Sequence, residues 1–444
     1  MNQLLISTED VTVVRNSLLS DDMERCAILF AAEARMQNGS VRLLVRDFVL
    51  VEDHDYISRD SLHAKIKPEL VALVTKRAQR ENLSLVFVHS HMGPEAPHFS
   101  PVDDEGEQQL AQFLSHRHPS RMHAALVLSN GGYRARILGK AAEIVMISIG
   151  DTRKILFTPD CGIDGVSEAF DRQVRAFGKD GQRAIGALSI GIVGLGGTGS
   201  LVAQQLMHLG VKKFVLIDPD RLEETNLNRV VNAVRGDIGS PKVQIAKRAI
   251  LAHAPEAEVT TIEGDVVRAK IAATLFDTDI IFSCTDSHGS RAVLQQVSYQ
   301  YFIPCVDMGT TILVREGQVE GIYGRIQLLA PGRACFTCSG LLNSEEVRRD
   351  MLTDYEKKLD PYIPGSREPA PAVISLNSTV ASMAITMFMA LVTELPIASR
   401  YVNYNAKTFS LRPVRATPDP NCYICSRKGA FGLGDGSPLF ARQD

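Results

Sequence analysis

A glycine-rich turn restricts the possible folds of this chain more than any other feature. The segment GLGGTG at positions 194–199 follows an apolar run at 188–193 and precedes helical spacing over 200–209. Glycines at such a turn let the backbone approach a phosphate group closely, and the N-terminus of the helix then stabilises that group. The pattern predicts a strand, a turn and a helix that bind a nucleotide. By itself it fits a nicotinamide dehydrogenase equally well.

Strands and helices alternate from about residue 184 onward. We expect strands at 188–193, 214–217 and 280–284 and helices at 200–209 and 242–252. This βαβ rhythm predicts an α/β protein with a parallel, doubly wound sheet. The first 150 residues instead mix β-forming runs at 25–31 and 41–51 with helical spacing at 64–79 and 104–116. The segment Asn130-Gly131-Gly132 lies between two further apolar runs and predicts a hairpin.

Residues 150–167 lack clear periodicity and include proline and glycine. We therefore predict a first domain over 1–150, a linker over 151–167 and a second domain over 168–444.

Composition excludes several classes of protein. The 444 residues include 48 Lys plus Arg and 51 Asp plus Glu, a net charge of -3, whereas nucleic-acid binders usually have a strong basic excess. Apolar stretches such as 383–392 are shorter than the ~20 residues of a membrane span. The N-terminus lacks the basic region of a signal peptide. We expect a cytoplasmic protein with no nucleic-acid and no membrane partner.

Four of the eight cysteines form two C-x-x-C pairs. Cys335 with Cys338 and Cys422 with Cys425 could each hold one side of a tetrahedral ion, and four thiolates make a closed structural zinc site. Without a secretion signal, this cysteine usage favours metal ligation and reduced thiols over disulfides. Reduced thiols in the core are the alternative.

A histidine-rich turn lies where the apolar run 83–88 ends. His89 and His91 stand two residues apart, so their side chains point the same way on an extended chain. A carboxylate from the following loop, which holds Ser100 and Asp103, would complete a three-ligand site. Such a site leaves a fourth position for water, as in catalytic zinc centres. Surface histidines in a polar loop are the alternative.

Together with Glu24, the His-x-His and Ser-x-x-Asp segments resemble the signature of the JAMM (MPN-type) zinc metalloproteases. The resemblance implies an MPN/cytidine-deaminase-like α/β fold for the first domain and cleavage of peptide or isopeptide bonds after a ubiquitin-like tail. It further implies a catalytic Zn²⁺ held by His89, His91 and Asp103. Glu24 would be the general base, and Ser100 would help to stabilise the tetrahedral intermediate.

Charged residues after the glycine turn favour a reaction that splits a triphosphate. Such a reaction needs cations on the leaving group and a carboxylate for magnesium, whereas a bound dinucleotide needs little side-chain positive charge. Arg229 and Lys242 suit the phosphates, and Asp286 at the end of a strand suits Mg²⁺. Asp218 ends another strand and suits a ribose hydroxyl.

These motifs, in this order, resemble the adenylation domain of the ubiquitin-activating, ThiF/MoeB superfamily from about residue 168 to the C-terminus. The resemblance implies a Rossmann-like, doubly wound adenylation domain with a four-cysteine zinc knuckle, which uses ATP and Mg²⁺. It also implies a homodimer in which the catalytic Arg172 reaches the ATP of the partner protomer, while Asp286 is catalytic and holds magnesium. The expected nucleotide-binding residues are Gly194, Gly196, Gly197, Gly199, Asp218, Asp220, Asn226, Asn228, Arg229 and Lys242.

The segment 339–421 contains no cysteine, although the family commonly has a nucleophilic cysteine there. We therefore expect the acyl-adenylate to pass directly to an outside nucleophile, such as the thiol of a conjugating enzyme, or an amine. The chain is expected to be bifunctional: it cleaves after the C-terminus of a ubiquitin-like protein or peptide and activates such a C-terminus. The alternatives are a peptide-adenylating enzyme of the antibiotic-biosynthesis type, or an adenylation enzyme whose first domain is a non-catalytic scaffold.

Overall fold

Two compact units make up the protein in the computed structural model, which describes residues 1–159, 165–359, 370–393 and 395–443. Unit 1 comprises Met1–Ile163, Gln300–Phe302 and Ser426–Pro438, and unit 2 comprises Asp164–Tyr299, Ile303–Cys425 and Leu439–Asp444. Each unit is built around an eight-stranded sheet. Part of the expected linker, including Cys161, lies outside the described residues.

Unit 1 contains a mixed sheet with the strand order β10-β9-β1-β3-β2-β6-β7-β8. Alternate residues of β2 point to opposite faces, so Ala27 and Leu29 join one core cluster with α1, whereas Ile28 and Phe30 join another with α2 and α3. Both faces of the sheet are therefore apolar and covered. The elements are β1 (Gln3–Ser7), α1 (Thr8–Leu18), β2 (Cys26–Arg35), β3 (Val41–Leu50), α2 (Pro68–Glu81), β6 (Ser84–Ser90), α3 (Pro101–Arg117), β7 (Ala124–Ser129), β8 (Gly132–Ile137), β9 (Val145–Ile149) and β10 (Arg153–Phe157).

Local structure in unit 1 departs from the sequence prediction at two places. The expected helix at 64–79 is wrong at its start, because Ala64–Ile66 forms strand β5 against β4 (Tyr56–Arg59) and α2 begins only at Pro68. A proline disfavours helical backbone in the residue before it, and Lys67 is extended. Part of the expected linker also belongs to the sheet, since β10 pairs with β9. The hairpin of β7 and β8 is confirmed.

A short C-terminal segment, Ser426–Pro438, belongs to unit 1. Arg46 of β3 donates from Nε to the carbonyl oxygen of Phe431 at 2.8 Å, and Arg427 forms an ion pair with Asp10. The two units therefore do not correspond to two uninterrupted halves of the sequence.

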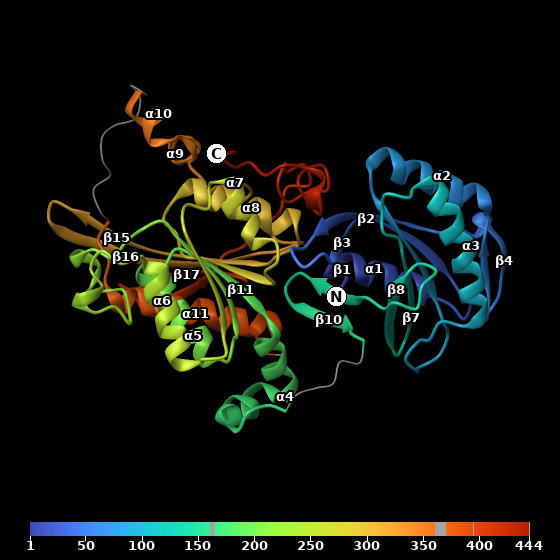
Figure 1. Ribbon diagram of the computed structural model, residues 1–444, viewed down its shortest axis with the longest axis horizontal. Helices are drawn as coiled ribbons and strands as arrows, with labels where there is room; N and C mark the ends of the chain where they lie inside the picture. Colours follow the sequence, from blue (N-terminus) through green and yellow to red (C-terminus); the bar gives the residue numbers. More distant parts are fainter. Residues whose placement is uncertain (160–164, 360–369, 394, 444) are drawn as a thin grey trace. The chain divides into compact units, whose positions relative to one another are not determined.

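Unit 2 contains a sheet with the order β13-β12-β11-β14-β15-β16-β17-β18. The first five of these strands are parallel, whereas the pairs from β15 to β18 are antiparallel, so a parallel sheet is the wrong expectation for that half. Figure 1 shows α7 and α8 on one face of the sheet and α5, α6 and α11 on the other. The strands are β11 (Ser189–Val193), β12 (Lys213–Asp218), β13 (Glu258–Glu263), β14 (Ile280–Ser283), β15 (Cys305–Arg315), β16 (Gln318–Leu329), β17 (Tyr401–Asn405) and β18 (Ser410–Pro413).

A tight turn between β15 and β16 forms the first antiparallel pair of this half. Glu316 and Gly317 both have positive φ, at 51° and 78°, which is the backbone of a two-residue hairpin turn. Asn or Asp followed by Gly is the usual signal for this turn, and Glu-Gly is a weaker one. The helices of the unit are α4 (Asp171–Ala187), α5 (Gly197–His208), α6 (Lys242–His253), α7 (Ala269–Ala272), α8 (His288–Gln300), α9 (Ser344–Met351), α10 (Asp354–Leu359) and α11 (Ile374–Val392).

Helix α11 is the apolar helix of the unit 2 core. By length and composition alone, its 19 residues could cross a membrane. The expectation that every apolar stretch is shorter than a membrane span is therefore wrong for this helix. Val380, Phe388 and Leu391 of this helix belong to the same buried cluster as Leu206 and Phe282. The helix therefore forms part of the hydrophobic core of unit 2.

Phe388→Ala is expected to destabilise unit 2 strongly. The ring of Phe388 is fully buried and its centroid lies 5.6 Å from that of Phe282. Its removal leaves a cavity, so we expect the free energy of unfolding to fall by about 3–5 kcal/mol, measured by urea unfolding with circular dichroism. The control is Phe409→Ala, because Phe409 is 85% exposed and its loss should change stability by about 0.5 kcal/mol at most. Equal losses in both variants would contradict the assignment of Phe388 to the core.

Candidate functional site

The glycine turn brings three backbone segments into close contact at the carboxyl end of β11. Gly194 has a φ of +88°, and a Cβ atom there would lie 2.7 Å from the carbonyl oxygen of Cys284. A Cβ atom on Gly199 would lie 1.8 Å from the carbonyl oxygen of Gly194, so only glycine fits this position. Gly196 is the N-cap of α5, and a Cβ atom there would meet nothing within 4 Å. A Cβ atom on Gly197 would instead lie 2.2 Å from Nδ2 of Asn377, so the open space at the start of α5 is on the side of Gly196.

A cavity of about 890 Å³ opens at this turn, which is a typical size for a small-molecule site. Most residues that the sequence predicted to bind a nucleotide or magnesium line it: Gly194, Gly196, Gly197, Asp218, Asp220, Arg229, Lys242 and Asp286. Among the residues that the structure describes, the predicted Gly199, Asn226, Asn228 and Arg172 are not part of its lining. Gly199 and Asn226 are buried, and Arg172 is exposed on α4.

Asp218 ties the glycine turn to the end of β12. Its buried carboxylate accepts hydrogen bonds from the backbone N–H of Leu195 at 2.5 Å and of Asp220 at 2.8 Å. Burial raises the pKa of the Asp218 carboxyl above its usual value. This carboxylate therefore positions the turn as well as facing the cavity.

Lys242 and Arg229 bring positive charge to the cavity wall. Lys242 is the first residue of α6, and its Nζ lies 2.7 Å from Oδ2 of Asp220. Nη1 of Arg229 donates to the carbonyl oxygen of Thr225 at 2.7 Å and to Oδ1 of Asn228 at 3.2 Å. Asn228 therefore orients Arg229 from outside the lining of the cavity.

Asp286 is exposed on the cavity wall, in the loop between β14 and α8. Asp350 of α9, which the sequence analysis missed, holds this loop. Its Oδ2 accepts hydrogen bonds from Oγ of Ser287 at 2.8 Å and from the backbone N–H of Gly289 at 3.0 Å. No local pattern indicates this contact, because α9 is far away along the chain.

Two arginines that the sequence analysis also missed line the same cavity around a buried carboxylate. Asp307 of β15 is fully buried, Nε of Arg291 lies 3.0 Å from its Oδ1, and Arg325 forms an ion pair with its Oδ2. The hydroxyl of Ser283 donates to Oδ1 at 2.7 Å. Burial opposes ionisation, but the charges of Arg325 and Arg291 hold the pKa of Asp307 below its usual value. In the sequence, the position of Asp307 inside the apolar run 302–308 indicates a buried carboxylate that needs a charged partner.

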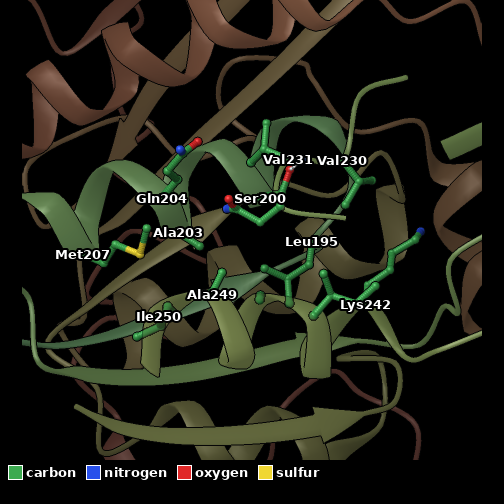
Figure 2. A pocket seen from close by; sticks show the side chains of 13 residues that line it. Leu195, Ser200, Ala203, Gln204, Met207, Val230, Val231, Lys242, Ala249 and Ile250 are labelled. Atoms are coloured by element: carbon green, nitrogen blue, oxygen red, sulfur yellow. Dashed lines mark hydrogen bonds between the residues drawn. The ribbon is translucent and has the colours of Figure 1, made fainter. Parts of the chain in front are cut away.

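A second hollow between α5 and α6 is far smaller. Figure 2 shows Ala203, Met207 and Ile250 among the mainly apolar side chains around it. It has a volume of about 10 Å³, which is about the space of one water molecule at most. It is a packing gap rather than a ligand site.

The four cysteines of the two C-x-x-C pairs converge in unit 2. The Sγ atoms lie 3.7 Å apart for Cys335 and Cys338, 3.6 Å for Cys335 and Cys422, and 3.5 Å for Cys338 and Cys425. A tetrahedral site with Zn–S bonds of about 2.3 Å needs sulfur atoms about 3.7 Å apart. The donor set fits a structural zinc ion that would join residues 335–338 to residues 422–425.

In unit 1, the predicted metal ligands come together at the end of β6. His89 pairs with Cys26 at the start of β2, which brings Glu24 beside the histidines. Nε2 of His89 lies 3.2 Å from Oδ1 of Asp103, and Nε2 of His91 lies 3.5 Å from Oδ2 of Asp103 and 3.6 Å from Oε1 of Glu24. Two imidazoles and a carboxylate within 4.8 Å of one another fit a zinc site with an open position.

A capping box at the start of α3 places the carboxylate of this cluster. The backbone N–H of Asp103 donates to Oγ of Ser100 at 3.2 Å, and the N–H of Ser100 donates to Oδ2 of Asp103 at 2.6 Å. Burial opposes ionisation of Asp103, but its hydrogen bonds with His89 and His91 hold its pKa well below the usual value. Glu24 is buried, and burial raises its pKa.

The remaining described thiols are poor nucleophiles. Burial raises the pKa of Cys284 and Cys305 and raises that of Cys26 to about 12. Because the thiolate is the reactive form, these cysteines are suited to packing rather than to thioester chemistry.

Comparisons with known proteins identify the C-terminal part. The ThiF family matches residues 170–424. The molybdopterin-synthase adenylyltransferase of Escherichia coli K12 is 28% identical over 260 residues, which cover 58% of this chain and 96% of that protein. The SAMP-activating enzyme E1 of Haloferax volcanii is 24% identical over 261 residues, 58% of this chain and 87% of that protein. The solved structure of E. coli MccB with AMPCPP and MccA is 19% identical, and the match covers 60% of this chain and 76% of that chain with a TM-score of 0.47.

The family match begins at residue 170, so it gives no support to a metalloprotease domain in the N-terminal part, which depends on the geometry of unit 1 alone. The expectation of an adenylyltransferase domain of the ThiF type is confirmed for residues 170–424. Since the match spans more than half of the sequence, the chain belongs to the ThiF family.

Proposed function

We propose that unit 2 binds ATP in the large cavity and adenylates the C-terminal carboxylate of a ubiquitin-like protein or a peptide. The observation that carries this proposal is the convergence of the glycine turn, Asp218, Arg229, Lys242 and Asp286 on one cavity. Membership of the ThiF family and the names of two relatives, a molybdopterin-synthase adenylyltransferase and a SAMP-activating enzyme E1, support it.

The cavity wall matches the charges of the reaction. In this proposal the N-terminus of α5 and the cations Arg229 and Lys242, which line the cavity, would bind the phosphates, and Asp218 would bind the ribose. Asp286 would hold Mg²⁺, which when bound reduces the negative charge that the substrate carboxylate must approach. An oxygen of that carboxylate forms a bond to the α-phosphorus, the bond between the α- and β-phosphates breaks, and pyrophosphate leaves.

The activated acyl group then passes to a nucleophile outside this chain. The segment 339–421 has no cysteine, Cys305 is buried, and the raised pKa of the half-buried Cys284 makes its thiol a weak nucleophile. The acceptor is either the thiol of a conjugating enzyme or an amine. We place the protein in the cytoplasm, where the thiols that form the four-cysteine site stay reduced.

This proposal has two forms that differ in the substrate. In one the substrate is a ubiquitin-like modifier, and in the other it is a short peptide of the antibiotic-precursor type. Both require the same adenylation step, which the family relationship supports. Incubation with ATP and candidate ubiquitin-like proteins or peptides, followed by mass spectrometry for AMP-modified carboxyl termini, identifies the substrate.

A second candidate function, zinc-dependent hydrolysis after a ubiquitin-like C-terminus, is favoured by the cluster in unit 1. His89, His91 and Asp103 would hold the ion, which when bound makes water acidic enough to supply hydroxide at neutral pH. Glu24 lies beside the cluster and would accept the proton of that water, and Ser100 would help to stabilise the tetrahedral intermediate. A non-catalytic scaffold is the alternative for unit 1.

Gly196→Ala and Gly199→Ala should separate ligand binding from folding. A Cβ atom at 196 meets open space, so the fold should remain while the added methyl group obstructs the phosphates and weakens ATP binding by about tenfold or more. A Cβ atom at 199 meets a carbonyl oxygen, so this variant should lose stability itself. Thermal unfolding and fluorescent nucleotide titration measure the two effects. Unchanged nucleotide affinity in the folded Gly196→Ala variant would contradict the phosphate position.

Asp286→Ala should stop ATP–pyrophosphate exchange that depends on the acyl substrate, because the variant loses the carboxylate that we propose holds Mg²⁺. Nucleotide binding should weaken less than exchange, since the glycine turn, Arg229 and Lys242 remain. Exchange at the wild-type rate would show that Asp286 does not take part in the reaction.

Arg172→Ala should also lower exchange, although Arg172 does not line the cavity of its own protomer. If the arginine acts across a homodimer, mixing Arg172→Ala with Asp286→Ala yields heterodimers with one intact site. We expect activity well above that of either variant alone, up to about a quarter of the wild type for random mixing. Absence of any rescue, with dimers verified by light scattering, would argue against the trans arginine.

Zinc content tests unit 1 and the cysteine cluster together. We expect about two zinc ions per chain, about one after His89→Ala and about two in Glu24→Gln, because Glu24 is not a ligand. Glu24→Gln should abolish cleavage of a ubiquitin-like fusion because the general base is lost. Cleavage by this variant would exclude Glu24 as the base, and one zinc in the wild-type chain would favour the scaffold.

A further inference from the structure

The large cavity has a second part that the nucleotide does not explain. Beyond the glycine turn, its wall continues along β15, β16 and β17, where Gly309, Thr311, Tyr323, Arg325 and Asn403 line it. Arg291 of α8 faces the same part, and a Cβ atom on Gly309 would lie 3.3 Å from its Nη2. This part of the wall carries two guanidinium groups, those of Arg291 and Arg325.

The two arginines are held in place from behind. Asp307 has no exposed surface and is not part of the lining, and its two carboxylate oxygens engage Arg291 and Arg325. Ser283 of β14 adds a hydrogen bond at 2.7 Å. Arg325 also donates to Oε1 of Gln327 at 3.4 Å, and its guanidinium lies 5.7 Å from the ring centre of Phe336. Each guanidinium therefore has a defined position, with side chains of Arg291 and Arg325 only 13% and 17% exposed.

The charge balance of this part favours an anion. Two positive groups face the cavity, while the single carboxylate that accompanies them is buried behind the wall, so the surface seen by a ligand is positive. The carboxylates of the cavity lining, Asp218, Asp220, Asp265 and Asp286, belong instead to the loops around the glycine turn. Guanidinium groups in a partly buried site bind carboxylates strongly and repel ammonium groups.

The reacting carboxylate is a poor partner for this pair. Two guanidinium groups would withdraw charge from the oxygen that must attack the phosphorus, so binding there would slow the reaction. A side chain a few residues before the end of the substrate has no such conflict.

We propose that Arg291 and Arg325 read the charge of the substrate tail, binding an acidic side chain close to its C-terminus and disfavouring a basic one. This inference rests on the proposed function of unit 2. Arg291 and Arg325 are specificity-determining residues, and Asp307 is a positioning residue that acts through them.

Direct binding tests the inference without turnover. The probes are fluorescein-labelled short peptides that end in two glycines and differ only in the preceding residue, which is glutamate, glutamine or lysine. Fluorescence anisotropy with the full-length protein should give a dissociation constant at least about tenfold lower for the glutamate peptide than for the lysine peptide. Arg325→Gln should reduce this ratio to about twofold, Arg325→Lys should retain most of it, and Arg325→Glu should reverse it.

Asp307→Asn tests the positioning role. It should weaken the glutamate peptide and leave the glutamine peptide nearly unchanged, a difference that a general loss of structure would not produce. Arg412→Gln, which removes an exposed arginine of β18 outside the cavity, is the control for net charge and should leave the ratio as in the wild type.

Several outcomes would overturn the inference. These are equal affinities of the wild type for all peptides, binding of none of them, or a ratio that Arg325→Gln does not change. A weaker affinity of Arg325→Gln for a fluorescent ATP analogue, with the peptide ratio intact, would assign the arginines to the phosphates instead. If the wild type does not bind the ATP analogue, the proposed function is wrong. The ratio of the dissociation constants of the lysine and glutamate peptides would then still show whether the cavity prefers an acidic side chain.

Discussion

The close approach of backbone segments at the glycine turn is the contact on which the cavity of unit 2 depends. The end of β11, the start of α5 and the residue that follows β14 meet there because Gly194 and Gly199 have no side chains. A carboxylate at the end of β12, that of Asp218, fastens the turn through the N–H of Leu195. With these segments held together, the N-terminus of α5 and the loop that carries Asp286 line the same cavity.

Unit 1 uses a different constraint for its cluster. Strand register brings the residues next to the start of β2 beside the end of β6, and a capping box turns Asp103 toward the two histidines. Each of these contacts is ordinary local structure: a strand pair and a helix cap. Their combination brings His89, His91 and Asp103 together and places Glu24 beside His91, although this part of the chain lies outside the family match.

Much of this arrangement could be predicted because the signals were local. The glycine turn, the His-x-His segment and the paired cysteines each need only short spacing to be recognised, and the structure brings each predicted group together. The start of α2 was misjudged because the effect of Pro68 on Lys67 outweighs the helical spacing before it. The antiparallel half of the unit 2 sheet was missed because its first turn, at Glu316 and Gly317, has a weak sequence signal.

Residue order alone reveals which chemical groups the chain carries and where the glycine turn begins, since close backbone approach demands glycine and a tetrahedral thiolate site demands cysteine pairs. Packing of the elements settles which of the predicted residues face the cavity: Asn228 orients Arg229 from outside the lining, and Asn226 is buried. It also decided the pairing of Asp307 with Arg291 and Arg325, and of Asp350 with the loop of Asp286. These contacts join residues far apart along the chain, so no spacing rule expresses them; they arise only when the strands and helices pack.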